Sequence, residues 1–175
     1  MAEPVIPPKA KLIAGLLCGR ESLAGSAIAG LEARFGPVDL ESAAMKFEHS
    51  DYYRDMGDDL KRSFISFERL IERDAIAGIK IFTNGLESSL SEGEHRLINI
   101  DPGYLTLSNL FLASCKEYYH RAYLSAGVYL ENEYRYTGGR FVPWDWTYPD
   151  YRTPESLEFF HRVREKYHGQ IRAGG

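Results

Sequence analysis

The 175-residue sequence predicts an α+β fold with a ferredoxin-like, split βαβ core, extended by a helix, a long β-hairpin and a C-terminal helix. Some segments show the two-residue period of a strand or a continuous apolar run, and others show the 3.6-residue period of a helix. In chain order the first six read strand, helix, strand, strand, helix, strand. This is the order of the split βαβ unit.

The first half of this core starts with an apolar run over residues 9–18 that has the length of a buried strand. A second strand is predicted over residues 43–47, where apolar and polar side chains alternate. Between the two strands we expect a helix that stops at Gly36-Pro37. Its apolar stripe consists of Ala24, Ile28, Leu31 and Phe35.

The second half of the core contains a strand over residues 61–70, a helix and a last strand over residues 95–101. Asp74 is the expected N-cap of this helix, which runs to Leu90. Its stripe consists of Ile76, Ile79, Phe82 or Thr83, Leu86 and Leu90.

The stretch NIDPGYL, residues 99–105, predicts where the core ends. We expect Asp101 to end the last strand and to cap a further helix, with Pro102 at the first helical position. That helix is predicted over residues 105–116, because several side chains keep helical spacing: Leu107, Leu110, Phe111 and Ser114.

The C-terminal part predicts a hairpin and a helix. Two alternating segments joined at Gly127 form the hairpin, and the helix starts at Thr153-Pro154. Residues 1–8 contain three prolines and are expected to form a flexible arm before a single domain over residues 9–175.

Composition limits the class of protein. Hydrophobic residues make up 44% and charged residues 26% of the chain, as in ordinary globular proteins. A net charge of -4 and the lack of a long apolar run predict neither a nucleic-acid nor a membrane partner. Both cysteines lie in apolar segments and the N-terminus has no signal-peptide pattern, so we expect a cytoplasmic protein with reduced thiols.

Three polar segments are candidates for a site. The first is the loop DYYRDMG with Asp51, Tyr52 and Tyr53, which is either an ordinary connection or part of a ligand site. The second is the hairpin, whose expected register sets Tyr123 opposite Tyr129 and Arg121 opposite Glu131. The face of the hairpin that carries these residues is exposed to solvent, forms one wall of a ligand cleft, or binds another protein or a second copy of the chain; the sequence leaves these alternatives open.

The third segment is WDWTYPDYRTPE, which precedes the last helix. It offers Asp150, Tyr151 and Arg152 beside a helix N-terminus that favours anions. The same aromatic residues are also suited to packing a terminal segment onto a core.

Common catalytic motifs do not occur in the sequence, including the phosphate loop, the dinucleotide fingerprint and the zinc-protease helix. Three acids of the polar segments and the core end, Asp51, Asp101 and Glu131, offer the oxygen ligands that Mg²⁺ or Mn²⁺ prefers, and His120 could carry protons between groups. This combination predicts, as one alternative, a metal-dependent phosphohydrolase with Asp101 and His120 as catalytic candidates.

Six segments resemble, in order and across nearly the whole chain, a family of bacterial proteins classed as a domain of unknown function: KLIAGLL, SDYYRDMG, SFERL, NIDPGYLTL, HRAYLSAGVYLE and WTYPDYR. Ser50-Asp51 and Asp55-Met56 stand where the family resemblance leads us to expect Thr-Asp and Glu-Met. Some members carry the label "GTP-binding protein". That label implies ligand contacts at Asp51, Asp101, His120, Arg121, Asp150 and Arg152.

Taken together, these features favour a protein that binds a small anionic ligand, phosphate-bearing or nucleotide-like, in a cleft lined by Tyr, Asp and Arg. The sequence leaves open whether the protein catalyses a reaction and how many copies associate.

Overall fold

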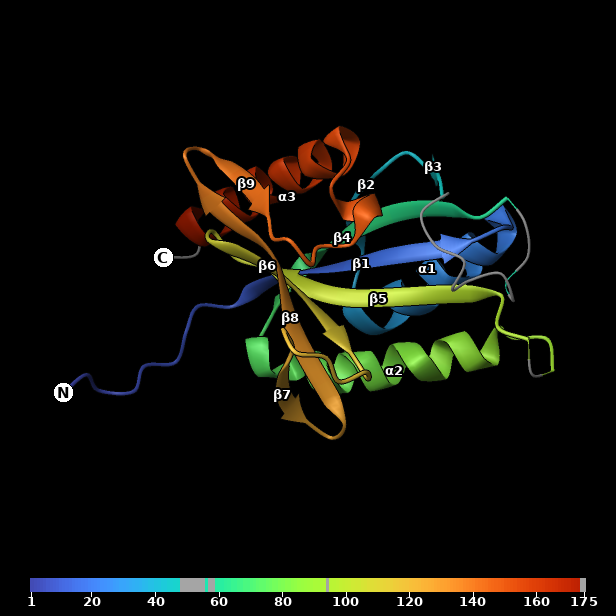
Figure 1. The fold of residues 1–175 in the computed structure, drawn as a ribbon, viewed down its shortest axis with the longest axis horizontal. Coiled ribbons are helices and arrows are strands. Elements are labelled where there is room, and N and C mark those ends of the chain that lie inside the picture. Colours follow the sequence, from blue (N-terminus) through green and yellow to red (C-terminus); the bar gives the residue numbers. More distant parts are fainter. Residues whose placement is uncertain (48–55, 57–58, 94, 174–175) are drawn as a thin grey trace.

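A computed structural model describes residues 1–47, 56, 59–93 and 95–173. Within them, nine strands form one sheet that is flanked by helices (Figure 1). The strands are β1 (Ala10–Cys18), β2 (Val38–Glu41), β3 (Met45–Lys46), β4 (Lys61–Ile71), β5 (Ile98–Leu105), β6 (Asn109–Ser114), β7 (Ala122–Ser125), β8 (Val128–Thr137) and β9 (Arg140–Pro143). The α-helices are α1 (Glu21–Phe35), α2 (Ile76–Ser89) and α3 (Pro154–Ala173), and the 3-10 helices are η2 (Arg73–Ala75) and η3 (Pro149–Tyr151).

The sheet is antiparallel and has the order β2-β4-β1-β5-β6-β8-β7, with β3 also paired to β4 and β9 to β8. The α+β class is therefore confirmed. Three strands of the predicted core lie side by side as β4-β1-β5, and β3, which falls within the predicted second strand, pairs with β4. The finer ferredoxin-like assignment stays a prediction. None of the described helices is long and apolar enough to cross a membrane.

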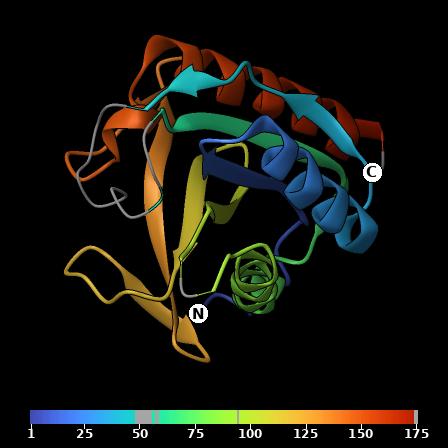
Figure 2. The same ribbon diagram turned by 90° about the vertical axis from the view of Figure 1, so that its right-hand side faces the viewer.

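Strand β1 is buried on both faces, which explains its continuous apolar run. Leu12, Ala14 and Leu16 belong to the core under α1 and α2, whereas Ile13 belongs to the core under α3. These helices accordingly lie on opposite sides of the sheet (Figures 1 and 2). The central strand thus links the two layers of the hydrophobic core.

Several predicted element ends are confirmed. Helix α1 ends at Gly36, which has a φ of 92° and donates its N–H to the Glu32 carbonyl. Helix α3 starts at Pro154, and the Thr153 hydroxyl accepts the Ser156 N–H as an N-cap does. The hairpin also pairs Tyr123 with Tyr129 as predicted.

The helix predicted over residues 105–116 is wrong, because this segment contains strand β6. Leu110 and Leu112 point into the core under α3, while Phe111 and Ala113 pack in the core under α1 and α2. A strand buried on both faces has apolar residues at nearly every position, so its spacing also matches a helix.

The prediction that Asp101 ends a strand and caps a helix is also wrong. Strand β5 continues through the whole stretch to Leu105, and Asp101 pairs with Gly15 of β1. Strand β6 pairs with β5 only from Gly103 to Leu105. Pro102 has no N–H to donate and lies just before the first residue of β5 that pairs with β6. The part of β5 that precedes Pro102 is not paired with β6.

Two smaller predictions also need correction. The strand expected over residues 43–47 is reduced to β3, and the neighbouring strand β2 was not predicted. Asp74 makes no capping bond, because η2 precedes α2 and the N-cap is Ala75, which has no side-chain cap. Short edge strands and 3-10 turns carry too few residues for a clear period.

The close approach of β5 and β6 at Gly103 yields a stability prediction. A methyl group on Gly103 would collide with the backbone carbonyl oxygen of Phe111, which cannot move without breaking the ladder. We expect Gly103→Ala to lower the free energy of unfolding in urea by about 1–3 kcal/mol. Gly85→Ala is the control, because space is open there within α2, and it should stabilise by about 0.4–1 kcal/mol. Equal effects of both changes would contradict the assigned ladder.

Candidate functional site

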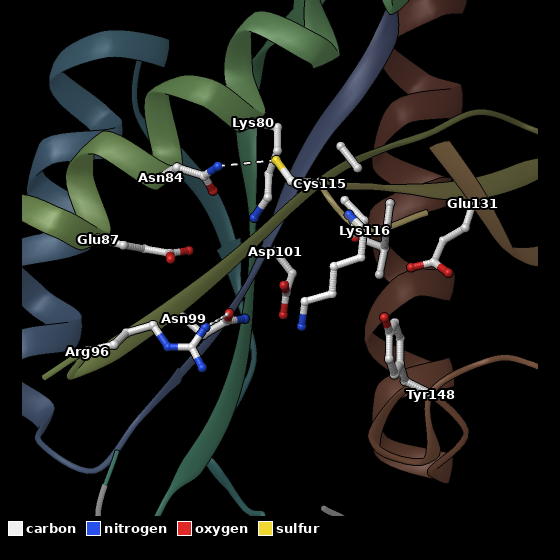
Figure 3. Close-up of a pocket in the computed structure, with 13 residues that line it drawn as sticks. Lys80, Asn84, Glu87, Arg96, Asn99, Asp101, Cys115, Lys116, Glu131 and Tyr148 are labelled. Carbon is white, nitrogen blue, oxygen red and sulfur yellow. Dashed lines mark hydrogen bonds between the residues drawn. The ribbon is translucent and has the colours of Figure 1, made fainter. Parts of the chain in front are cut away.

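A pocket of about 150 Å³ lies where β5 and β6 separate, with α2 along one side (Figure 3). We call it the α2–β6 pocket. Helix α2 contributes Lys80, Asn84 and Glu87, and β5 with the preceding residues contributes Arg96, Asn99 and Asp101. The remaining wall consists of Leu112, Ala113, Ser114, Cys115, Lys116, Glu131 and Tyr148.

The open edge of β5 fixes α2 against the pocket. Among the described residues, Ile100 has no strand partner on this side, and its backbone groups bind α2 side chains instead. The Lys80 ammonium donates to the Ile100 carbonyl at 3.0 Å, and Glu87 accepts the Ile100 N–H at 2.7 Å. Buried backbone groups need such partners, so the interrupted ladder requires polar residues on this face of α2.

The two acids near this edge have opposite pKa shifts. Burial raises the pKa of Glu87 above its ordinary value, although the nearby Lys80 charge works against it. Burial also acts to raise the pKa of Asp101, but the charges of Arg62 and Lys80, together with hydrogen bonds from Asn99 and Arg62, outweigh it and hold that pKa below its ordinary value. Asp101 is therefore a carboxylate throughout the neutral range.

Arg62 connects three parts of the fold beneath the pocket. Its Nη1 donates to Asp101 of β5 at 2.9 Å, and its Nε donates to Asp150 of η3 at 2.6 Å. The Arg62 and Asp150 side chains are almost entirely buried. Two acids predicted as ligand contacts are therefore bound to an arginine of β4.

Glu131 forms a second ionic group on the opposite wall. Its carboxylate accepts from Arg121 Nε at 2.9 Å, and His120 Nε2 lies 2.9 Å from it. The Arg121 guanidinium also donates to the Tyr148 hydroxyl at 2.6 Å and to the Lys116 carbonyl at 2.8 Å. The predicted partnership of Arg121 and Glu131 is therefore present, and it neutralises the negative charge of Glu131.

Aromatic rings surround the outer side of this ionic group. His120 stacks on Trp146 with ring centroids 5.2 Å apart, and Trp146 stacks on Trp144 at the same separation. A second, more open pocket here is lined by Tyr118, Tyr119, His120, Arg121, Trp146 and Tyr148. Tyr148 borders both pockets.

Glu133 is a buried acid beside this group and has an exposed fraction of 0%. The Tyr148 N–H and the Thr147 hydroxyl lie near its carboxylate and favour the charged form, but neither makes a well-formed hydrogen bond to it. Burial and the charge of Glu131 raise the pKa of Glu133 to about 8. The carboxyl group is therefore mostly protonated at neutral pH.

The structure brings only some of the predicted site residues to the α2–β6 pocket. Asp101 and Glu131 line it, whereas Asp150 and Tyr151 are buried in the fold. Arg152 donates to the backbone carbonyls of Trp144, Asp145 and Thr147, so it fastens the loop before η3. Asp51, Tyr52 and Tyr53 lie outside the described residues.

The sequence analysis did not single out four cationic residues in or beneath the α2–β6 pocket: Arg62, Lys80, Arg96 and Lys116. For Lys80 a signal was present, because Lys80, Asn84 and Glu87 have the i, i+4, i+7 spacing of one helical face. Arg62, Arg96 and Lys116 belong to no such local pattern.

Of the candidate metal ligands, Asp101 and Glu131 lie among the described residues, whereas Asp51 does not. Across residues 1–47, 56, 59–93 and 95–173, no group of three or more His, Cys, Asp or Glu side chains could hold a metal ion. Asp101 is bound to Arg62, and Glu131 to Arg121 and His120. Binding of Mg²⁺ or Mn²⁺ by these acids stays a prediction.

Residues 8–167 match the family described as "Domain of unknown function (DUF4416)". The chain belongs to this family, and the match covers nearly all of its length. Comparison with curated proteins and with solved structures found no significant match.

The buried arginine beneath the pocket yields a second stability prediction. Arg62→Met leaves two carboxylates without this cation, so we expect it to lower the free energy of unfolding by about 3–5 kcal/mol in urea titrations. Adding Asp150→Asn should recover part of that loss. Arg20→Met is the control, because the ion pair of Arg20 with Glu92 is exposed, and it should cost less than about 1 kcal/mol. A loss no larger than that of the control would contradict the role of Arg62.

The raised pKa of Glu133 predicts a pH dependence of stability. The folded protein keeps this proton up to about pH 8, whereas an unfolded chain releases it near 4.5. The free energy of unfolding of the wild type should therefore fall as pH rises between these values. Glu133→Gln should remove this part of the decline, as measured by urea unfolding at half-unit pH steps. Glu72 is exposed, so Glu72→Gln is the control and should keep the pH dependence of the wild type. If the free energy of unfolding of Glu133→Gln changes with pH in parallel with the wild type, Glu133 is not protonated in the folded protein.

Proposed function

We propose that the protein binds a small anionic ligand, through a phosphate-like group, in the α2–β6 pocket. The observation that carries the proposal is the charge balance of the lining. Three cationic side chains line the pocket, Lys80, Arg96 and Lys116, together with three acids. Two of these acids, Asp101 and Glu131, form ion pairs with Arg62 and Arg121, which lie outside the lining, and Arg62 is shared with the buried Asp150.

The third acid does not restore the balance. Glu87 accepts a backbone N–H, and burial raises its pKa, which disfavours its charged form. Counted together with Arg62, Arg121 and Asp150, five cationic side chains face four acids, so the site carries an excess of positive charge in a partly enclosed space. An anion entering this space exchanges water for charged donors, which form the stronger hydrogen bonds.

Asn99 connects a cation and an acid of the lining. It has an exposed fraction of only 6%, and its Oδ1 accepts from Arg96 at 3.2 Å. Its side chain also hydrogen-bonds Asp101, which favours the carboxylate form of that acid.

The size of the pocket limits what enters it. Its volume of about 150 Å³ is below the roughly 300–1,000 Å³ of pockets that enclose a drug-sized molecule. It suits a single anionic group, with the rest of the ligand outside. The aromatic pocket that shares Tyr148 lies beside it and offers rings for such a remainder.

Thermal unfolding in the presence of inorganic phosphate, sugar phosphates and nucleotides, GTP included, tests the proposal. A ligand at 100 times its dissociation constant adds about 2.7 kcal/mol to the free energy of unfolding. For a chain of this size that corresponds to a rise in Tm of about 5–10 °C.

The variant Lys80→Met should lose most of this ligand-dependent rise, whatever its own Tm. Lys9→Met is the matched control, because Lys9 is exposed, is paired with Glu72 and does not line the α2–β6 pocket, and it should keep the rise. No shift with any of these compounds at millimolar concentration would refute the proposal. The same shift in both lysine variants would place binding elsewhere.

A further inference from the structure

The aromatic pocket beside the α2–β6 pocket is large enough to hold a small organic group. Its volume is about 360 Å³, which lies within the roughly 300–1,000 Å³ of pockets that enclose drug-sized molecules. Four of the six described residues that line it carry phenol or indole rings, and the other two are His120 and Arg121. The pocket therefore offers mainly flat, apolar surface.

Stacked rings fix one part of the aromatic pocket. Trp146 Nε1 donates to the Asn132 carbonyl at 2.9 Å, which holds the indole against β8. The ring planes of Trp146 and Trp144 are inclined by only 8°, and those of Trp146 and His120 by 11°. The Arg135 guanidinium packs on the Trp144 ring, 4.5 Å from its centroid. A group that enters the pocket thus meets aromatic side chains that need little further ordering on binding.

The tyrosines of the aromatic pocket are exposed. The exposed fractions are 57% for Tyr118, 81% for Tyr119 and 39% for Tyr148. Tyr118 and Tyr119 lie with ring centroids 5.0 Å apart, and both meet His120 edge to face. Exposed aromatic side chains that gather around a hollow are typical of binding sites. A planar ring placed among them gains offset-stacked or edge-to-face contacts.

Tyr148 joins the aromatic pocket to the α2–β6 pocket, because it lines both. Figure 3 shows Tyr148 and Glu131 across the α2–β6 pocket from the side chains of α2. The Tyr148 hydroxyl accepts from the Arg121 guanidinium at 2.6 Å and still carries a proton to donate. The ion pair of Arg121 and Glu131 has one member in each lining. The two pockets therefore lie side by side on one set of side chains.

The charge of the lining selects the kind of group that fits. Aromatic cages also bind quaternary ammonium ions, which the faces of the rings attract. In this pocket the Arg121 guanidinium belongs to the lining, and no carboxylate does among the described residues. A cationic group is therefore repelled, whereas an uncharged planar ring is not.

We propose that the aromatic pocket binds an uncharged planar ring, so that the ligand of the protein is an anion that carries an aromatic ring. The phosphate-like group lies in the α2–β6 pocket, and the ring packs among Tyr118, Tyr119 and Tyr148. The inference rests on the proposed function for the place of the anionic group. It adds the chemical class of the rest of the ligand, which anion binding alone does not imply.

Matched phosphate monoesters test the inference. Phenyl phosphate is compared with cyclohexyl phosphate, and 2-phenylethyl phosphate with 2-cyclohexylethyl phosphate. Each pair shares its anionic group and differs in the ring, and the second pair reaches further. Isothermal titration calorimetry on the full-length protein gives the dissociation constants. Trp144 and Trp146 are the two tryptophans of the chain, so tryptophan fluorescence reports on this part of the molecule.

We expect the aromatic member of at least one pair to bind about threefold to tenfold more tightly than its saturated partner, as favourable contacts between aromatic rings provide. Phenyl and cyclohexyl groups bury similar apolar area, so burial by itself gives no such preference. The same ester should change the tryptophan emission over the concentration range in which it binds. Equal dissociation constants within both pairs overturn the inference.

The exposed tyrosines offer variants that keep the fold. The double variant Tyr118→Leu/Tyr119→Leu should bring the dissociation constants of the two members of a pair together. Tyr123→Leu is the matched control and should keep the preference, because Tyr123 is 63% exposed and lines neither pocket. A preference that survives in the double variant, or that disappears in the control, also overturns the inference.

The two proposals fail in different ways. If inorganic phosphate and all four esters bind equally well, and Lys80→Met weakens them all, anion binding stands and the aromatic class of the ligand is refuted. If the uncharged 2-phenylethanol binds and changes the tryptophan emission, but no phosphate compound raises the Tm, the ring site stands and phosphate-like ligand binding is refuted.

Discussion

The buried guanidinium of Arg62 is the interaction on which the site depends. It binds Asp101 of β5 and Asp150 of η3, so one cation joins the centre of the sheet to the loop before α3. Charges buried this deeply are tolerated only when they are paired and hydrogen-bonded. The position of η3 and of the preceding loop with Tyr148 is therefore tied to the floor of the α2–β6 pocket. Arg152 fastens the same loop from outside through backbone carbonyls.

The pocket itself results from an interruption of the sheet. Strands β5 and β6 approach closely at Gly103 and separate beyond it, where Pro102 cannot donate a hydrogen bond. The unpaired backbone of Ile100 then binds Lys80 and Glu87, which brings a polar face of α2 to the gap. A requirement of backbone hydrogen bonding thus creates a charged cavity. Arg62 and Arg121 form ion pairs with two of its acids, Asp101 and Glu131, from behind the lining.

Membership of a family without an established function leaves the chemistry to be argued from the site. The binding proposal rests on the cationic side chains of the lining, which come from α2 and from the segments flanking β5 and β6.

The sequence by itself determined the elements with a strong local pattern. Strand β4, helix α1, the hairpin and helix α3 were predicted because their periods, glycine stops and caps act over neighbouring residues. It also identified Asp101, Glu131 and Arg121 as residues of interest. Only the tertiary structure decided that residues 109–114 form a strand, since burial on both faces removes the period. It alone decided that Arg62 meets Asp101 and that Lys80 meets Ile100, because such contacts depend on the order and separation of distant strands, for which no local pattern exists.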